Sequence, residues 1–325
     1  MNRGGIPKPM DLTGLRTYPL GGRPSKVFAE ELGRPVGAEA SIADFIASLP
    51  AQLAGKTLLR VRDELCRARD EGRTVVAALG GHVIKTGCAP YLIDWIRQGV
   101  VTAVAMNGSV AIHDYELSTV GKTSEDVGAV LNAGNFGMAR ETADAMALAA
   151  RRGATEGFGL ALGDLMAEAR DRGAMAHPEA SLVLAARDAG ISCTIHVAMG
   201  TDVVHMHPQV SGAALGEATM TDFRRLCTVV AGLAGGVWLN LGSAVVLPEV
   251  FLKAVSVARN FGHDLAGLVA VNLDKESKYR TFTNVMSRPA SVGLELTGHH
   301  EILLPLLHAA VACKAVSAKG ARKAA

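Results

Sequence analysis

Short apolar runs alternate with amphipathic segments along most of the chain. The apolar runs predict strands at residues 74–79, 101–106, 191–198, 237–241 and 268–273. Apolar residues spaced three and four apart predict helices over residues 41–72, 90–98, 140–152, 164–172, 178–189, 221–234, 248–260 and 302–313. Strands that alternate with helices in this way are typical of an α/β protein with a mostly parallel sheet and helices on both faces.

The two ends of the chain lack this alternation. Residues 1–40 are rich in glycine and proline and have weak periodicity, so they predict an N-terminal arm. The arm could pack on a partner subunit or remain loosely ordered. Residues 41–315 predict a single domain, and residues 316–325 a basic, alanine-rich tail.

Composition narrows the class of protein. Apolar residues make up 49% of the chain and aromatic residues only 4%, so the core must consist mainly of Ala, Val, Leu and Ile. Such a core suits buried parallel strands. With 33 basic and 31 acidic residues, the net charge is only +2, which gives no electrostatic basis for binding nucleic acid.

Cysteine spacing and hydropathy indicate the compartment. The five cysteines form no CxxC pair, which argues against a disulfide framework or a zinc ribbon. No apolar run is long enough for a membrane span, and the first residues do not resemble a signal peptide. We therefore expect a cytoplasmic protein that does not bind membranes.

Seven of the ten histidines lie at or near the ends of apolar runs, beside glycines, amides and carboxylates. These polar ends include Gly81 and His82, Asn107 and Gly108 with His113, Asp114 and Glu116, then His196, Asp202, His205 and His207, Asn272 and Asp274, and finally His299 and His300. Open α/β sheets bind ligands at the carboxyl ends of their strands. The sequence therefore predicts an enzyme with its site at that edge.

The chemistry of these imidazoles stays open from spacing alone. Imidazoles can act as acids and bases, as ligand contacts or as metal ligands. In an extended segment His205 and His207 would point to the same face, which is compatible with a divalent metal. His113 and Asp114 could equally belong to the first turns of a helix, where acidic side chains interact favourably with the helix dipole.

Several of these short segments together resemble the deoxyhypusine synthase family. The similarity extends over about residues 74–308, and it is carried by residues 80–85, 107–109, 113–114, 134–136, 202–207, 242–246, 271–272, 287–289 and 303–307. The resemblance implies a Rossmann-like, NAD-dependent enzyme that assembles as a homo-oligomer, a dimer or a tetramer. Members of the family oxidise a polyamine and transfer its aminobutyl group through an imine on a lysine.

The resemblance and the positions of the polar strand ends together predict roles for individual residues. NAD would contact Gly81, His82, Asn107, Gly108, Asn272, Asp274 and His300. Catalytic groups would be His113, Asp114, His205 and His299. A small amine substrate would lie near Glu116, Asp202 and His207.

One family feature is absent from this sequence. In the family a segment with the nucleophilic lysine follows the Arg-Pro pair, whereas here Pro289 is followed by Ala290, Ser291 and Val292. We therefore expect NAD-dependent aminoalkyl transfer or oxidation of a polyamine or related small amine, and not deoxyhypusine synthesis. The alternatives are a metal-dependent hydrolase or lyase that uses the strand-end histidines, and a non-catalytic protein that binds a ligand.

Overall fold

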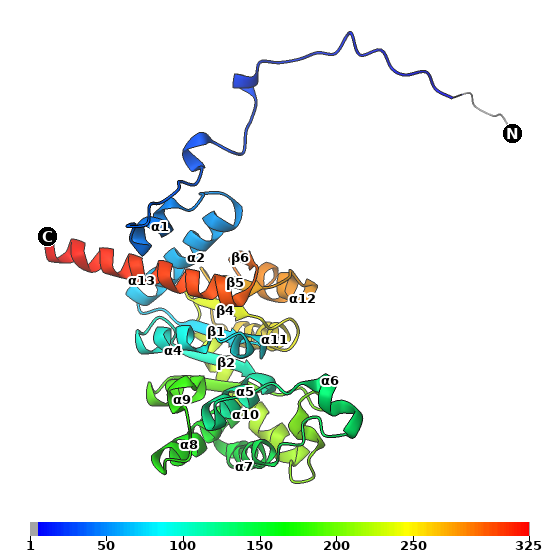
Figure 1. Ribbon diagram of the computed structural model, residues 1–325, viewed down its shortest axis with the longest axis vertical. Helices are drawn as coiled ribbons and strands as arrows, with labels where there is room; N and C mark the ends of the chain where they lie inside the picture. The colour runs from blue at the N-terminus through cyan, green and yellow to red at the C-terminus, as the bar shows by residue number, and fades with distance from the viewer. Residues whose placement is uncertain (1–5, 325) are drawn as a thin grey trace.

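The sheet of the protein is entirely parallel. The computed structural model describes residues 6–324, with side chains described for residues 6–314. Within this range six strands form one sheet in the order β3-β2-β1-β4-β5-β6 (Figure 1). They are β1 (Val75–Leu79), β2 (Ala103–Asn107), β3 (Ser192–His196), β4 (Val237–Leu241), β5 (Val269–Asp274) and β6 (Val292–Thr297). The predicted Rossmann-like α/β class is confirmed, and the strand order reverses between β1 and β4.

Helices precede the first strand, connect successive strands and follow the last one. They are α1 (Ile42–Ser48), α2 (Leu53–Asp70), α3 (His82–Lys85), α4 (Ala89–Arg97), α5 (Gly108–Val120), α6 (Val127–Val130), α7 (Arg140–Glu156), α8 (Phe158–Asp171), α9 (Leu182–Asp188), α10 (Gly212–Ala231), α11 (Val246–Asn260), α12 (Tyr279–Thr281) and α13 (His300–Ala324). Short 3-10 turns are η1 (Leu20–Gly22), η2 (Ala29–Glu31), η3 (Leu131–Ala133), η4 (Pro178–Ala180) and η5 (Val203–Met206), and η6 (Phe282–Ser287) is a π-helix. The predicted helix over residues 41–72 is in fact two helices, α1 and α2, with Pro50 between them.

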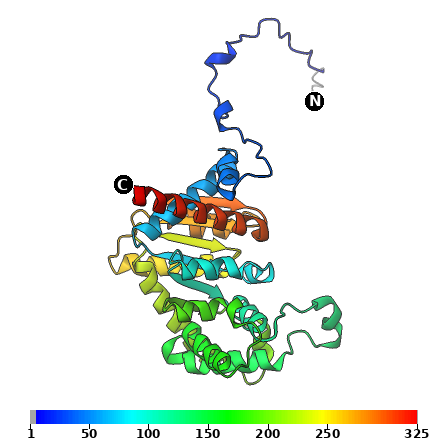
Figure 2. The ribbon, with the colours of Figure 1, turned by 60° about the vertical axis from the view of Figure 1, so that its left-hand side comes forward.

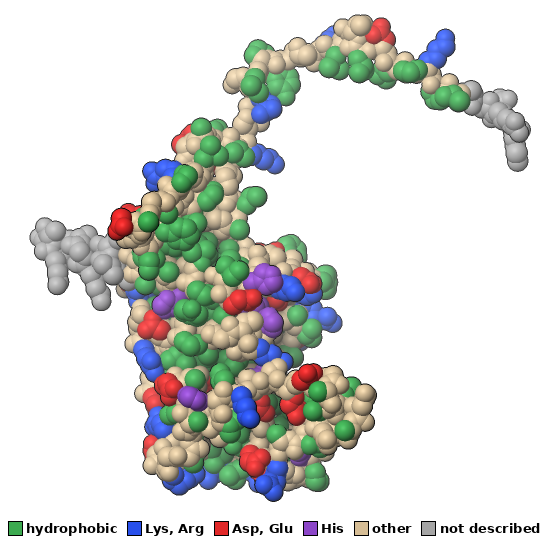
Figure 3. Space-filling model, viewed as in Figure 1, with side chains coloured by type: hydrophobic (Ala, Val, Ile, Leu, Met, Phe, Trp, Pro, Cys, Tyr) green, Lys and Arg blue, Asp and Glu red, His purple; other side chains and the backbone are tan. Residues whose placement is uncertain are grey.

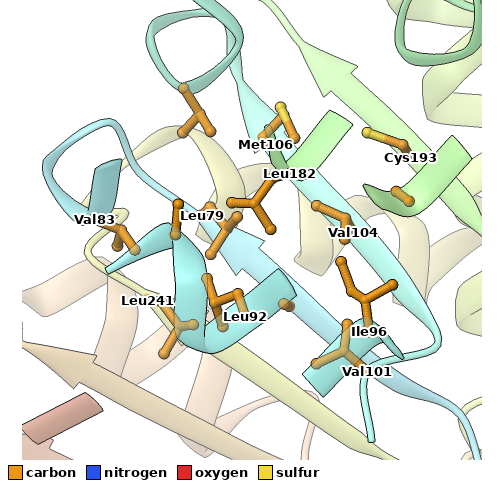
Figure 4. Close-up of a cluster of buried hydrophobic side chains, with 14 of the residues drawn as sticks. Leu79, Val83, Leu92, Ile96, Val101, Val104, Met106, Leu182, Cys193 and Leu241 are labelled. Atoms are coloured by element: carbon orange, nitrogen blue, oxygen red, sulfur yellow. The ribbon is translucent and has the colours of Figure 1, made fainter. Parts of the chain in front are cut away.

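Two apolar layers cover the sheet. Alternate strand residues such as Leu79, Val104 and Leu241 face one layer, in which α2, α4, α9 and α13 pack (Figure 4). The opposite residues face α10, α11 and η6, and there Trp238 stacks on Phe251 with 3.9 Å between ring centroids. Because both faces are buried, the central strands are continuous apolar runs in the sequence.

Among the elements that were not predicted, β6 and α5 each have a physical reason. β6 alternates apolar and polar residues because it is an edge strand with one partly exposed face. α5 has almost no amphipathic periodicity because its buried residues, among them Val110, Ala111 and Ile112, lie on more than one side of the helix. A helix buried on several sides loses the signal that reveals a surface helix.

The N-terminal segment leaves the body of the molecule. Residues 6–40 contain only the two turns η1 and η2, and they extend away from the domain (Figures 1 and 2). Large apolar side chains along them are exposed, among them Ile6, Met10, Tyr18 and Leu20. The first five residues of the predicted arm, the side chains of the predicted tail at 316–325, and residue 325 itself lie outside the described residues. No helix in the described part of the chain is long and apolar enough to cross a bilayer.

Candidate functional site

Closely packed glycines lie where the strand order reverses. Gly80 follows β1 and Gly242 follows β4, and a Cβ built on Gly80 would lie 2.0 Å from the carbonyl oxygen of Gly242. A Cβ on Gly81 would lie 2.3 Å from Ser109 Oγ. Glycine is therefore required where these strand ends approach each other. Carboxyl-end crevices at such a reversal are the ligand sites of open α/β sheets.

A cavity of about 220 Å³ opens on the same edge, between α5, the segment of residues 121–139 and the loop before η5. Figure 3 shows the lobe that contains α6 projecting beside it, with acidic side chains close by. The residues that line the cavity are Lys85, Ser109, Ile112, His113, Glu116, Ser124, Glu125, Val127, Phe136, Thr201, Asp202 and Val203. Three of the residues predicted for the site, His113, Glu116 and Asp202, thus lie around one cavity.

Asp202 lies against the first turn of α5. A Cβ on Gly108 would lie 2.0 Å from Asp202 Oδ2, so the carboxylate fits there only because residue 108 is glycine. Burial raises the pKa of Asp202, and the nearby His205 and His113 rings oppose this. The result is a shielded acidic group at the end of the cavity.

His205 supports Asp202 from behind. Its Nδ1 accepts the backbone N–H groups of Gly200 at 3.1 Å and of Asp202 at 3.2 Å. In the neutral ring the proton is therefore on Nε2. This Nε2 is buried without a hydrogen-bond partner among the described residues and lies 3.9 Å from Asp202 Oδ2.

His113 belongs to a chain of polar contacts. Its Nδ1 lies 2.7 Å from Thr123 Oγ1, which donates to Glu116 Oε2 at 2.5 Å. Thr142 donates to the other oxygen of Glu116 at 3.0 Å. Burial acts to raise the pKa of Glu116, but the contacts with His113, Thr123 and Thr142 outweigh it and leave the pKa below its usual value. Glu116 is therefore an ionised anchor.

Asp114, predicted as catalytic, has a structural position. It is 1% exposed and faces away from the cavity, toward the start of α9. Its oxygens accept Ser181 Oγ at 2.5 Å and the N–H groups of Leu182 at 2.7 Å and Val183 at 3.3 Å. These hydrogen bonds of the Asp114 side chain therefore stabilise the N-terminus of α9.

Two other predicted histidines do not line the cavity. His207 Nε2 donates to the carbonyl of Gly137 at 2.8 Å, which fastens the segment of residues 121–139. His299 has a side chain that is 57% exposed, and it pairs with Glu301 at 3.5 Å. The expectation that His205 and His207 point to one face assumed an extended segment, whereas η5 turns them to different partners.

The residues predicted to contact NAD lie on the same edge at varying depth. His82 is exposed, and its ring packs edge-on against His300, with 5.4 Å between centroids. Asn107 caps α5 by accepting the N–H of Val110 at 3.1 Å. Asn272 is buried in the sheet, where it accepts from Asn240 at 2.9 Å and donates to Glu295 at 3.2 Å.

Asp274 ends β5, and His300 begins α13 nearby. Asp274 Oδ1 accepts the N–H of Lys275 at 2.7 Å. His300 is 1% exposed, and its Nε2 donates to the carbonyl of Leu273 at 3.2 Å. Burial lowers the pKa of His300, so the ring is neutral and Nδ1 is a buried acceptor with no partner among the described side chains and backbone. Together with the glycine-lined strand ends, an unsatisfied acceptor fits a ligand with an amide donor, such as a nicotinamide carboxamide.

A metal has no support in the side-chain geometry. Among the described residues no group of three or more His, Cys, Asp or Glu side chains could hold a metal ion. The residues that would have formed such a site diverge, since His205 faces Asp202 and His207 faces Gly137.

Several residues of the cavity were not predicted for the site. They are Ser109, Thr201, Glu125 and Phe136 in the lining, and Thr123 behind His113. Ser109 and Phe136 lie within the segments of family resemblance and could have been found there. Thr123 and Glu125 follow α5 in a polar stretch with no pattern of its own.

Comparison with known proteins supports the fold more than the function. No protein-family model matches the chain. In sequence it is similar to the bifunctional arginine dihydrolase/ornithine cyclodeaminase ArgZ of Synechocystis sp., with 38% identity over 58 residues, which is 18% of this chain and 8% of ArgZ.

Solved structures share the architecture. AgrE in its ternary complex with ornithine and NAD+ superimposes with a TM-score of 0.55 and 18% identity over 81% of this chain and 34% of AgrE. A conserved LOR/SDH protein from Methanococcus maripaludis S2 superimposes with a TM-score of 0.52 and 16% identity over 80% of this chain and 70% of that protein. A protein named as a deoxyhypusine synthase from Entamoeba histolytica gives only 0.46 and 10%, too little to establish family membership. The chain spans about a third of AgrE, and these likenesses define an α/β Rossmann-like protein.

Proposed function

We propose that the protein is an NAD-dependent enzyme that oxidises a small cationic amine. The observation that carries the proposal is the pairing of two features on one sheet edge. One is the set of closely packed glycines at the strand reversal, and the other is a cavity with Asp202, Glu116 and His113.

The cavity suits a small cation. Its 220 Å³ is below the range of about 300–1,000 Å³ that is typical of pockets for drug-sized ligands. Asp202, Glu116 and Glu125 line it against the single cation Lys85. In a partly buried site these carboxylates stabilise an ammonium group. Asp202, which lies against the first turn of α5, is the carboxylate that we expect to pair with the ammonium.

The chain's own groups divide the work of amine oxidation. Gly81 and Gly242 at the strand ends, together with His300, would hold NAD+, which would supply the acceptor for a hydride from the carbon beside nitrogen. That carbon can lose a hydride only after the ammonium has lost a proton. His113 Nε2 takes this proton, since its Nδ1 is bound to Thr123. Asp202 then stabilises the iminium cation that results.

Two comparisons support this substrate class. AgrE was solved in a ternary complex with ornithine and NAD+, and ArgZ is a bifunctional arginine dihydrolase/ornithine cyclodeaminase, so an amine with a second amino group is a reasonable substrate to test. The resemblance to deoxyhypusine synthases points to a polyamine instead. An iminium ion can be hydrolysed, it can be attacked by a second amine of the same molecule, which closes a ring and releases ammonia, or it can transfer its alkyl group to another amine. The products distinguish these three reactions.

Calorimetry with NAD+, followed by mass spectrometry of reactions with ornithine, putrescine and spermidine, tests the proposal. We expect NAD+ to bind and at least one amine to be converted. His113→Gln should lower turnover by about 10²–10⁴-fold without weakening NAD+ binding. The exposed His263→Gln serves as the matched control. No heat of binding with millimolar NAD+ would refute the proposal, and so would full activity of His113→Gln.

A further inference from the structure

We infer that Thr123 is a positioning residue, which holds His113 in the tautomer whose Nε2 is free to accept a proton. The inference deepens the proposed function, because it names the device that makes His113 a base. It rests on three contacting side chains, Glu116, Thr123 and His113, of which only Thr123 lies outside α5.

The direction of each hydrogen bond follows from the donors available. Glu116 is ionised and can only accept, so the 2.5 Å contact uses the single hydroxyl proton of Thr123. Thr123 Oγ1 then has only lone pairs to offer His113 Nδ1 at 2.7 Å. Nδ1 must therefore carry the ring proton, and Nε2 is left as the acceptor. The two histidines beside Asp202 thus have opposite tautomers, since His205 is protonated on Nε2.

Thr123 reaches this position through the segment of residues 121–139. α5 ends at Gly121 with a φ of 74°, which turns the chain back toward His113. Within the segment, the N–H of Gly137 donates to Glu125 Oε2 at 2.7 Å. The carbonyl of Gly137 accepts from His207 at 2.8 Å, which fastens the far end of the segment to the residue after η5. A Cβ on Gly137 would lie 2.7 Å from Val203 Cβ, so the segment packs closely on η5.

This arrangement links the cavity wall to the base. Phe136 and Val127 of the same segment line the cavity, while Thr123 sets the tautomer of His113. When the segment is in place, the wall is closed and Nε2 is an acceptor. When Thr123 withdraws, the ring loses the partner that selects its tautomer, and the fraction of competent base falls.

Nitrogen NMR of histidine-labelled protein tests the inference without any substrate. The wild type should show His113 with its proton on Nδ1, assigned by loss of the signal in His113→Gln. Thr123→Val keeps the shape of the side chain but removes the hydroxyl, and it should shift the proton toward Nε2. Thr123→Ser should restore the wild-type pattern, and the exposed Thr228→Val is the control. A wild-type proton on Nε2, or an unchanged spectrum in Thr123→Val, overturns the inference.

Kinetics give the second readout. On an amine that the wild type converts, Thr123→Val should lower kcat by about 10–100-fold, as loss of an outer-shell partner does elsewhere, with little change in KM. Thr123→Ser should recover most of the rate. An unchanged kcat in Thr123→Val would also overturn the inference. If the wild type converts no amine, the proposed function fails, and the NMR spectra still decide the role of Thr123.

Discussion

Replacing Asp114 by alanine is expected to destabilise the fold and leave ligand binding intact. Three buried donors now bonded to Asp114, namely Ser181 Oγ and the N–H groups of Leu182 and Val183, would lose their acceptor. An unsatisfied buried donor costs about 1–3 kcal/mol, and Ser181 can partly rearrange, so we expect a loss of about 3–5 kcal/mol in the free energy of unfolding. Domains are commonly stable by only about 5–15 kcal/mol, which makes this a large loss.

The effect should also depend on pH in a defined direction. Burial raises the pKa of Asp114 from 3.8 to about 6, against the hydrogen bonds that lower it. Between these values the folded protein retains a proton that the unfolded chain has lost, so wild-type stability falls as pH rises from about 4 to 6. At 1.36 kcal/mol per pKa unit this amounts to about 3 kcal/mol. Alanine removes this dependence on pH. The difference in the free energy of unfolding between wild type and variant should therefore narrow as pH rises from about 4 to 6.

Urea unfolding followed by circular dichroism at pH 4 and pH 7 measures both effects. Asp114→Asn retains one acceptor oxygen and should be milder, which keeps the test usable if the alanine variant does not fold. The control is Asp171→Ala, whose side chain is 70% exposed and whose effect should stay within about 0.5 kcal/mol. The reasoning is refuted if Asp114→Ala unfolds like the wild type, or if it keeps its stability but loses catalysis.

Three further outcomes follow from the structure. Gly108→Ala should displace the Asp202 carboxylate, which lies 2.0 Å from the added Cβ, and it should lower amine affinity about tenfold or more in calorimetry. The control is Gly212→Ala, at the first position of α10 with open space around it, which should leave amine affinity unchanged. Equal amine affinities in the two variants would exclude the displacement. Because burial raises the pKa of Asp202, amine affinity measured against pH should fall as pH decreases toward that raised pKa, and a flat profile would argue against an ion pair there. On the proposal that residues 1–40 pack on another subunit, deleting them should lower the mass measured by light scattering, because the deletion removes exposed apolar side chains such as Tyr18 and Leu20. An unchanged mass would contradict that proposal.

The sequence predicts which residues share an edge of the sheet, because this follows from parallel strands in any α/β protein. The carboxyl ends of such strands share one edge, and this alone brings Gly81, Asn107, Asp202 and His300 to the same side of the sheet. β6 was also readable in principle, since residues 292–297 alternate apolar positions with glycine or polar positions and lie between Pro289 and Gly298.

The orientation of side chains on α5 could not be read in the same way. Successive residues on a helix are turned by about 100°, so a correct placement of the strand end does not say which of His113 and Asp114 faces the cavity. The weak periodicity of α5 hides its register as well. The contact with Thr123 depends on how residues 121–139 fold back, which no local pattern encodes.

The register of α5 thus joins stability to function. Val110, Ala111, Asp114 and Ser118 are buried, and together they fix the rotation of the helix. This rotation leaves the other side of the helix for His113 and Glu116, which are three residues apart and hence neighbours on its surface. Because several buried contacts define the register, loss of Asp114 should weaken the fold without turning the helix. Loss of Thr123 should instead leave the helix in place and alter only the proton on His113. The two variants therefore separate the role of α5 as a structural element from its role as the support of a base.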